Sequence, residues 1–287
     1  MTIRGTTRIL GIFGDPVGHS LSPLMQNEAL AQTGIDAVYV PFPVRPESLG
    51  AAVAAIRSLG LWGVNVTVPH KEEVIRYLDA VDPDARLIGA VNTIVNRGGL
   101  LTGYNTDAPG LLCSLAEDLR FDPAGRRILL LGAGGACRAA LMALGRAGAA
   151  WVGIANRTRQ RADALVGEFS GALQGTNLAS FSLEPAELSA PLLHVDLLLN
   201  TSAVGLQGEC FADFPWDKLA SGAVVYDMVY GRPGTPLLQA ARARGHRVAD
   251  GLGMLAAQGE EAFYLWTGKR PPAGVMKARL LAECAGD

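Results

Sequence analysis

A short apolar run, residues 128–131, leads directly into the glycine-rich sequence Gly132-Ala133-Gly134-Gly135-Ala136. The apolar run predicts a buried strand, and the residues after the glycines have the spacing of a helix. In dinucleotide-binding βαβ units, glycines at this turn let the backbone approach a pyrophosphate at the helix N-terminus. Cys137 replaces the third glycine of the usual spacing. The prediction therefore depends on the placement of the loop between strand and helix, because such a loop alone is not specific.

The second strand of this unit, residues 151–155, ends at Asn156-Arg157-Thr158. This point lies roughly twenty residues past the loop, where an NAD-binding protein would carry an acidic residue for the ribose hydroxyls. Arg157 can instead bind a 2′-phosphate through its planar guanidinium, with Thr158 and Arg161 nearby. The sequence thus favours NADP over NAD. The alternative is that Arg157, Arg159 and Arg161 only form the solvated start of a helix.

Strand-like and helical patterns alternate from residue 8 onward, which predicts a parallel α/β architecture. Ser22 is expected to be the N-cap of the first helix, with Pro23 at its first position and Gly34 at its end. A hairpin is expected around Gly98-Gly99. Expected strands lie at 8–13, 37–44, 61–68, 91–97, 100–104, 195–199 and 223–226, and expected helices include 47–59 and 252–266.

The domain organisation follows from the same pattern. A new unit is expected after Asp107, and the helical segment that follows Gly251 can pack back onto the first unit. We therefore predict one domain of residues 1–107 completed by residues 251–287, and a second domain of residues 108–250.

Lys71 is one of only four lysines, which leaves 21 arginines among the 25 basic residues. An ammonium group can exchange its proton during catalysis, whereas a guanidinium remains charged. The stretch Val64-Asn65-Val66-Thr67-Val68 predicts a buried strand, and Pro69 is typical of the first turn of a helix. Lys71 would then project from a strand-to-helix junction, where open α/β sheets bind ligands. The alternative is an ordinary solvated lysine.

Polar side chains also cluster at other expected strand ends. Asn65 and Thr67 share one strand face because strands have a period of two. Together these groups can hold a ligand rich in hydroxyls, although each alone is typical of a cap or turn. The candidates are Ser20, Ser22, Asn65, Thr67, Asn92 and Asp107.

Composition limits the partners of this chain. The net charge is −2 and the pI about 6.1, which offers no basic field for nucleic acid or anionic membranes. Neither a signal-peptide core nor an apolar run of about eighteen residues occurs. The four cysteines and four histidines are dispersed, so we predict no metal site, reduced thiols and a cytoplasmic location. A small molecule is the expected partner. The oligomeric state is not fixed by the sequence, and a homodimer stays open.

Many of these motifs occur together, and in order, in one family. The chain resembles the shikimate dehydrogenase family over nearly its whole length. The motifs that carry the resemblance are Ser20-Leu21-Ser22-Pro23, Asn65-Val66-Thr67-Val68-Pro69-His70-Lys71, Gly89-Ala90-Val91-Asn92-Thr93, Gly103-Tyr104-Asn105-Thr106-Asp107, Gly132 to Ala136, Asn156-Arg157-Thr158, Asn200-Thr201-Ser202, Asp227-Met228-Val229-Tyr230 and Gly251-Leu252-Gly253-Met254-Leu255 with Gln258.

The resemblance implies reversible reduction of 3-dehydroshikimate to shikimate with NADPH, on the pathway to chorismate and the aromatic amino acids. It implies an N-terminal open α/β substrate domain, completed by the C-terminal helices, and an inserted Rossmann NADP-binding domain. Lys71 and Asp107 would form the catalytic pair. Substrate contacts would come from Ser20, Ser22, Asn65, Thr67, Asn92, Asp107, Tyr230 and Gln258. Cofactor contacts would come from Gly132, Ala133, Gly134, Gly135, Ala136, Asn156, Arg157, Thr158, Arg161, Met228 and Gly251.

Two alternatives remain at this stage. A quinate/shikimate dehydrogenase of the same superfamily would tolerate quinate and use NAD or NADP. Asp15 and Val17 stand where the family often has asparagine and isoleucine, which bears on fine substrate preference. An NADP-dependent sensor or regulatory binding module is the alternative from another class. The presence of both Lys71 and Asp107 argues against it.

Overall fold

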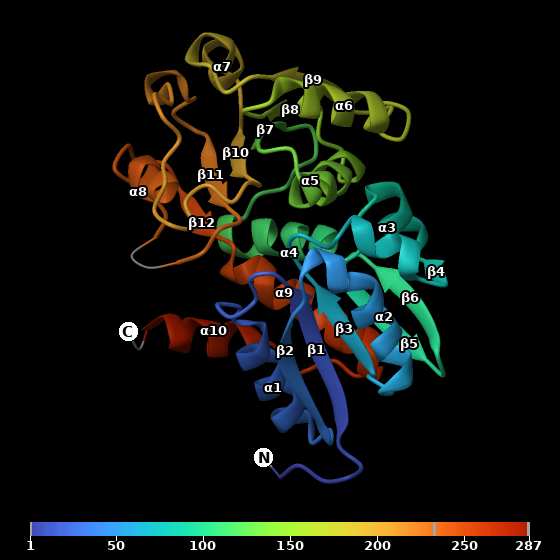
Figure 1. The fold of residues 1–287 in the computed structure, drawn as a ribbon. Coiled ribbons are helices and arrows are strands. Elements are labelled where there is room, and N and C mark those ends of the chain that lie inside the picture. The colour runs from blue at the N-terminus through green and yellow to red at the C-terminus, as the bar shows by residue number, and fades with distance from the viewer. Residues whose placement is uncertain (1, 232–233, 286–287) are drawn as a thin grey trace. The chain divides into compact units, whose positions relative to one another are not determined.

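The computed structural model describes residues 2–231 and 234–285 (Figure 1). The chain divides into two compact units, one of Met1–Gly110 with Leu255–Asp287 and one of Leu111–Met254. Each unit contains one six-stranded sheet with helices. The two helices α4 (Asp107–Leu119) and α9 (Leu252–Thr267) contain the residues at which the units meet in sequence. The expected α/β fold class is confirmed.

The sheet of the first unit is mixed rather than fully parallel. Its strand order is β2-β1-β3-β5-β6-β4. Strands β1, β2 and β3 are parallel, whereas β5 runs antiparallel to both β3 and β6. The bounds are β1 Arg8–Gly14, β2 Ala37–Pro43, β3 Gly63–Val66, β4 Ala80–Val81, β5 Thr93–Arg97 and β6 Leu100–Tyr104.

The predicted hairpin between β5 and β6 is confirmed. Gly98 and Gly99 have φ angles of 60° and 94°. A two-residue turn of this kind needs positive φ at both central positions, which glycine adopts without a steric penalty. The hairpin brings Asn92, which directly precedes β5, next to Tyr104, the last residue of β6, and Asn92 N donates to Tyr104 O at 3.0 Å.

Helices cover both faces of this sheet. Val64 and Val66 belong to one buried cluster with Val53 and Ile56 of α2 (Leu49–Ser58). Gly63 and Asn65 alternate with these valines and face the other side, where Trp266 of α9 donates from Nε1 to Ile94 O at 3.0 Å. Helices α1 (Ser22–Thr33) and α10 (Val275–Ala285) pack against each other in the same unit. The remaining helix is α3 (Pro83–Ile88), and 3₁₀ turns η1 and η2 span Pro46–Ser48 and Glu73–Tyr77.

Four local predictions were wrong. Ser22 is the first residue of α1 and makes no side-chain cap; Leu21 occupies the N-cap, and Gly34 ends the helix in the left-handed conformation as predicted. No helix begins at Pro69, because the chain turns there and the His70 ring is anchored 2.6 Å from Val44 O. The strand expected at 61–68 is correspondingly shorter, and a 3₁₀ turn rather than an α-helix begins the 47–59 segment.

The sheet of the second unit is fully parallel, with strand order β12-β11-β10-β7-β8-β9. The chain builds outward from β7 through β8 and β9, then returns to the other side of β7 with β10. This doubly wound order is that of the Rossmann fold, and its switch point lies between β7 and β10. The strands are β7 Arg127–Leu131, β8 Trp151–Ala155, β9 Asn177–Phe181, β10 Leu197–Asn200, β11 Val224–Asp227 and β12 Val248–Asp250.

The β10–β11 connection of this unit contains the 3₁₀ turn η3 (Trp216–Lys218), and α-helices connect the other consecutive strands. They are α5 Gly135–Arg146, α6 Arg159–Phe169, α7 Pro185–Leu192 and α8 Pro236–Arg242. Residues 128–131 of β7 and 197–199 of β10 are completely buried, which explains their uninterrupted apolar sequence. The edge strands β9 and β12 were not predicted, because their residues are only partly buried and neither strand has a run of apolar residues.

Candidate functional site

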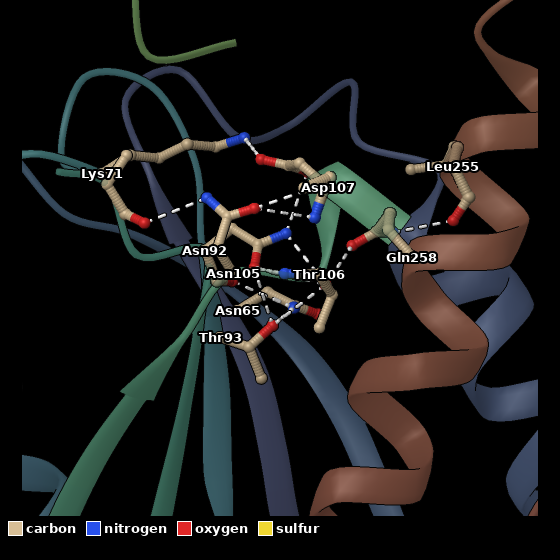
Figure 2. A network of polar contacts seen from close by, with 11 residues as sticks. Asn65, Lys71, Asn92, Thr93, Asn105, Thr106, Asp107, Leu255 and Gln258 are labelled. Atoms are coloured by element: carbon tan, nitrogen blue, oxygen red, sulfur yellow. Dashed lines mark hydrogen bonds and ion pairs between the residues drawn. The ribbon is translucent and has the colours of Figure 1, made fainter. Parts of the chain in front are cut away.

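The first unit contains a buried ion pair between Lys71 and Asp107 (Figure 2). Lys71 Nζ lies 2.6 Å from Asp107 Oδ2, and the two side chains are 19% and 8% exposed. Lys71 lies in the turn after β3, and its carbonyl accepts a hydrogen bond from Val91 N at 2.8 Å. Asp107 is the first residue of α4. The two residues are 36 positions apart in sequence, and the fold brings them into contact.

The carboxylate of Asp107 is held from several directions. Asn92 Nδ2 donates to its Oδ1 at 2.9 Å, so each oxygen has a different partner. Asn105 Oδ1 accepts from the backbone N–H groups of Asp107 and Ala108 and thereby caps α4. A charge with fixed hydrogen-bond partners needs little reorganisation when charge develops nearby.

Further polar side chains support Asn92. Its Oδ1 accepts from Thr106 N at 2.8 Å and from Thr93 Oγ1 at 3.1 Å. Thr106 Oγ1 lies 3.5 Å from Gln258 Oε1, and Gln258 Nε2 donates to Leu255 O at 2.7 Å. Figure 2 shows how these side chains gather at the end of the strands, with Gln258 reaching in from α9. The orientation of Asn92 is thus set by buried neighbours.

Asn65 joins this network from β3. Its Nδ2 donates to Thr93 Oγ1 at 3.0 Å, and its Oδ1 accepts from Tyr39 Oη at 2.7 Å. Burial raises the pKa of Tyr39 well above its usual value of 10, and a hydrogen bond with Ser22 acts in the opposite direction. Ser20 Oγ in turn accepts from Ser22 N at 3.3 Å. Tyr39 therefore links Ser22 to Asn65.

The structure gathers most of the predicted substrate residues. Hydrogen bonds and the ion pair connect Asn65, Lys71, Asn92, Asp107 and Gln258, and Tyr39 adds Ser22. The network also contains four residues that had no predicted role: Tyr39, Thr93, Asn105 and Thr106. The last three belong to the motifs that carry the family resemblance. Their signal was a polar residue within a buried strand or at its end.

The other two predicted substrate residues are Thr67 and Tyr230. Thr67 lies just after β3, where its backbone N–H donates to Phe13 O at 2.9 Å and its methyl group is close to Gly14. Tyr230 is half-buried and follows β11 in the second unit.

The glycine loop of the second unit lies between β7 and α5 as predicted. Gly132 has a φ of 114°, and a side chain there would press on Ser202 and Thr201. Gly134 is the N-cap of α5, and the space beside its Cα is open. Such a loop leaves backbone N–H groups at a helix N-terminus accessible to an anion. Cys137 is completely buried in α5, and this burial raises the pKa of its thiol to about 12.

The segment after β8 carries the predicted phosphate-binding residues. Asn156 Nδ2 donates to Thr158 O at 2.8 Å, which shapes the turn into α6. The side chains of Arg157 and Arg161 are exposed, whereas Arg159 is paired with Glu187 at 2.9 Å and lies 3.7 Å from Asp163. Of these three arginines, Arg157 and Arg161 are the ones presented for an external anion.

Met228 and Gly251 are brought together at the ends of β11 and β12. Met228 N donates to Asn200 O at 3.0 Å, and a side chain on Gly251 would collide with the carbonyl of Met228. Only glycine allows this close approach of the two backbones. The residues expected at the cofactor thus lie at the carboxyl ends of β7, β8, β11 and β12, the edge where doubly wound sheets bind ligands.

Three family models match the chain. Residues 12–94 match the shikimate dehydrogenase substrate binding domain, residues 114–188 match shikimate / quinate 5-dehydrogenase, and residues 251–281 match the shikimate 5'-dehydrogenase C-terminal domain. A curated relative from Geobacter metallireducens, named shikimate dehydrogenase (NADP(+)), is 54% identical over 282 residues, which cover 98% of this chain and 99% of the relative. The chain belongs to the shikimate dehydrogenase family. The resemblance seen in the sequence is thereby confirmed.

Solved structures of shikimate dehydrogenases share the fold. The enzyme from Thermus thermophilus, in complex with NADP(H) and shikimate, is 37% identical with a TM-score of 0.84, over 96% of this chain and 99% of that one. The enzyme from Listeria monocytogenes, in complex with shikimate and NAD, is 34% identical with a TM-score of 0.88, over 98% of both chains. The Rossmann character of the second unit therefore agrees with known shikimate dehydrogenases.

In this shikimate dehydrogenase family member, residues 2–231 and 234–285 contain no cluster of His, Cys, Asp or Glu that could hold a metal ion. Within the same residues, every helix is too short or too polar to cross a membrane.

Proposed function

We propose that this chain catalyses the reversible NADP(H)-dependent reduction of 3-dehydroshikimate to shikimate, the reaction that leads to chorismate and the aromatic amino acids. The observation that carries the proposal is the Lys71–Asp107 pair, fixed by Asn92 at the end of the first sheet. A sensor without catalysis would not need a proton donor held in this way. The quinate/shikimate dehydrogenase alternative is less favoured, because the exposed Arg157 follows β8 where NAD enzymes carry an acidic residue.

The substrate is expected to bind the polar residues around this pair. Hydroxyl and amide groups can donate to and accept from the hydroxyls of a polyhydroxylated ring, and hydroxyls can also donate to a carboxylate. Their placement on the ends of strands and helices gives such a site defined geometry. The proposed substrate residues are Ser20, Ser22, Asn65, Thr67, Asn92, Asp107, Tyr230 and Gln258.

The bound cofactor supplies the hydride that adds to the carbonyl carbon. Negative charge then develops on the carbonyl oxygen, and the Lys71 ammonium is placed to stabilise it and to donate a proton. Asp107 holds this ammonium in position through the 2.6 Å contact. Lys71 mainly binds and polarises the carbonyl oxygen, with proton delivery shared with Asp107 or solvent, and in the reverse direction the amine accepts the proton of the alcohol.

The second unit fits an NADP molecule. The glycine loop, Gly132 to Ala136, offers backbone donors at the N-terminus of α5, and Gly134 leaves room for a close phosphate. Asn156, Arg157, Thr158 and Arg161 would hold the adenosine ribose and its 2′-phosphate, for which a guanidinium is a bidentate partner. Met228 and Gly251 would lie along the nicotinamide half.

We assign the substrate domain to residues 1–107 with 251–287 and the cofactor domain to residues 108–250. The support is that each contains one complete sheet. We also propose a cytoplasmic location, since the described cysteines, Cys113, Cys137, Cys210 and Cys284, form no disulfide.

The proposal is tested by initial rates with shikimate or quinate paired with NADP⁺ or NAD⁺. Activity confined to shikimate with NADP⁺ is the expected result. Comparable rates with quinate or NAD⁺ would assign the protein to the quinate/shikimate branch. Cofactor binding without turnover in any combination would favour the sensor.

The Lys71→Met variant tests the catalytic role directly. We expect turnover to fall by roughly two to four powers of ten, because methionine neither carries charge nor donates a proton. Lys269→Met is the matched control, since Lys269 is exposed, and it should retain wild-type turnover. Near-normal turnover of Lys71→Met would remove Lys71 from the mechanism.

A further inference from the structure

Asp227, the last residue of β11, is completely buried. Three uncharged donors among the described residues contact its carboxylate. Asn200 Nδ2 and Val229 N donate to Oδ1 at 2.8 and 3.0 Å, and Thr235 Oγ1 donates to Oδ2 at 2.5 Å. Burial of a carboxylate is costly and is tolerated only where its hydrogen bonds are well satisfied. A buried carboxylate at position 227 is therefore expected to have a role other than filling space in the core.

Asn200 connects Asp227 by hydrogen bonds to the residues that contact the glycine loop. The two residues are register partners at the ends of the neighbouring strands β10 and β11. The other amide hydrogen of Asn200 reaches Val204 O at 3.0 Å, and its Oδ1 accepts from Ser202 N and Ser202 Oγ at 2.9 and 2.7 Å. Every hydrogen-bonding position of this amide is used to hold residues 200–204 in one conformation.

Residues 201 and 202 contact the start of the glycine loop. Thr201 Oγ1 donates to Leu131 O at 3.0 Å, and a side chain on Gly132 would come within 3.0 Å of Ser202 N and Cβ. A shift of Ser202 toward β7 would therefore displace Gly132, the first residue of the loop. Asp227 is separated from this contact by Asn200 alone.

Thr235 connects the same carboxylate to α8. Its Oγ1 accepts from Leu238 N at 3.4 Å as the N-cap of that helix, and it donates to Asp227. Val229 N is fixed by the same carboxylate, so the backbone immediately after Met228 is held as well. Asp227 thus ties three segments together: the loop after β10, the segment after β11 and the start of α8.

The topology indicates which half of a dinucleotide these segments support. The phosphate-binding residues of the adenosine half follow β8, on one side of the switch point. A dinucleotide lies across that point, so its other half lies over the ends of β10 and β11. Asn200 and Asp227 end these two strands.

We propose that Asp227, acting through Asn200 and Thr235, is a positioning residue that fixes the backbone on which the nicotinamide half of the cofactor rests. This inference rests on the proposed NADP site. In this proposal Asp227 does not itself touch the cofactor. Removal of its carboxylate should therefore weaken binding of the nicotinamide half of NADP⁺ and leave binding of the adenosine half nearly unchanged.

The test measures the dissociation constants of NADP⁺ and adenosine 2′,5′-bisphosphate by calorimetry, together with kcat. For Asp227→Ala we expect kcat to fall roughly 10- to 100-fold and the NADP⁺ dissociation constant to rise about tenfold, because a displacement near 1 Å is enough for such effects. Adenosine 2′,5′-bisphosphate should bind within about twofold of wild type, since its site follows β8. Equal weakening of both ligands, or no weakening of NADP⁺, would overturn the proposal.

Conservative variants separate positioning from folding. Asp227→Asn keeps an oxygen for Asn200 and Val229, and its amide can donate to the Thr235 hydroxyl, so we expect wild-type values within about threefold. If Asp227→Ala does not fold, Thr235→Val takes its place. It should weaken binding of NADP⁺, by a smaller factor, and leave binding of adenosine 2′,5′-bisphosphate unchanged, whereas Thr235→Ser should have wild-type values. Failure of Thr235→Val to change the NADP⁺ constant would overturn the proposal. A wild-type protein that binds neither ligand would instead refute the proposed function.

Discussion

The stability of the protein should respond to pH differently once Asp227 is replaced by asparagine. Burial raises the pKa of Asp227 from its ordinary value of 3.8 to about 6, although hydrogen bonds from Thr235, Val229 and Asn200 lower it. The charge of Asp250 adds a smaller upward contribution. Asparagine preserves the shape of the side chain and cannot ionise, so it removes this titration.

The sign and size of the effect follow from proton linkage. Between pH 3.8 and about 6 the folded protein holds the Asp227 proton more tightly than the unfolded chain does. The stabilisation is therefore complete below about pH 4 and is lost as the pH rises through 6. A difference of about two pH units, at about 1.4 kcal/mol each, corresponds to about 3 kcal/mol. This is roughly 6–12 °C in melting temperature for the unit that unfolds.

The assay is a series of reversible thermal melts of wild type and Asp227→Asn from about pH 4 to about pH 8, a range that brackets the titration. The difference in melting temperature, wild type minus variant, should fall by this amount across the range, because titrations common to both proteins cancel. Asp217→Asn is the control: Asp217 is exposed and Lys218 lowers its pKa, so its removal should cause only a small change of opposite sign. Parallel curves for wild type and Asp227→Asn would refute the reasoning.

Three further predictions concern the cofactor and the catalytic pair. Arg157→Ser should raise the KM for NADP⁺ about tenfold or more and leave that for NAD⁺ nearly unchanged, because only NADP⁺ carries the 2′-phosphate; equal effects on both cofactors would contradict this. Gly132→Ala should abolish NADP⁺ binding in calorimetry, since a positive φ and the contact with Ser202 both oppose a side chain. Asn92→Ala should lower kcat by roughly one to two powers of ten through loss of its hydrogen bond to Asp107, and an unchanged kcat would show that Lys71 alone orients the carboxylate.

Local sequence signals predicted the elements that depend on local geometry. The strand–loop–helix around Gly132 and the hairpin at Gly98 and Gly99 were recognised because glycine occupies positions that other residues avoid. The helix expected at Pro69 was wrong, because the buried His70 holds a turn through a contact with Val44, 26 residues away. Proline is compatible with both conformations, so only the tertiary contact decides between them.

In the candidate site, too, residues with a local sequence signal were predicted and residues defined by tertiary contacts were not. Lys71 and Asp107 were singled out by residue type and by their motifs, and the structure places them in contact. Tyr39 and Thr93 were given no role, because their significance lies in hydrogen bonds to Asn65 across 26 and 28 positions of sequence. Such pairings depend on strand order and register, which a single sequence does not specify.

The order of the units along the chain has a consequence for synthesis. The second unit is continuous, whereas the first needs α9 and α10, which follow the strands of the second unit in the sequence. Until they emerge from the ribosome, Met25 and Tyr39 lack the covering residues Gly259 and Trp266. The second unit therefore completes its fold first, and a nascent chain stalled before residue 255 exposes an apolar surface that chaperones would need to shield.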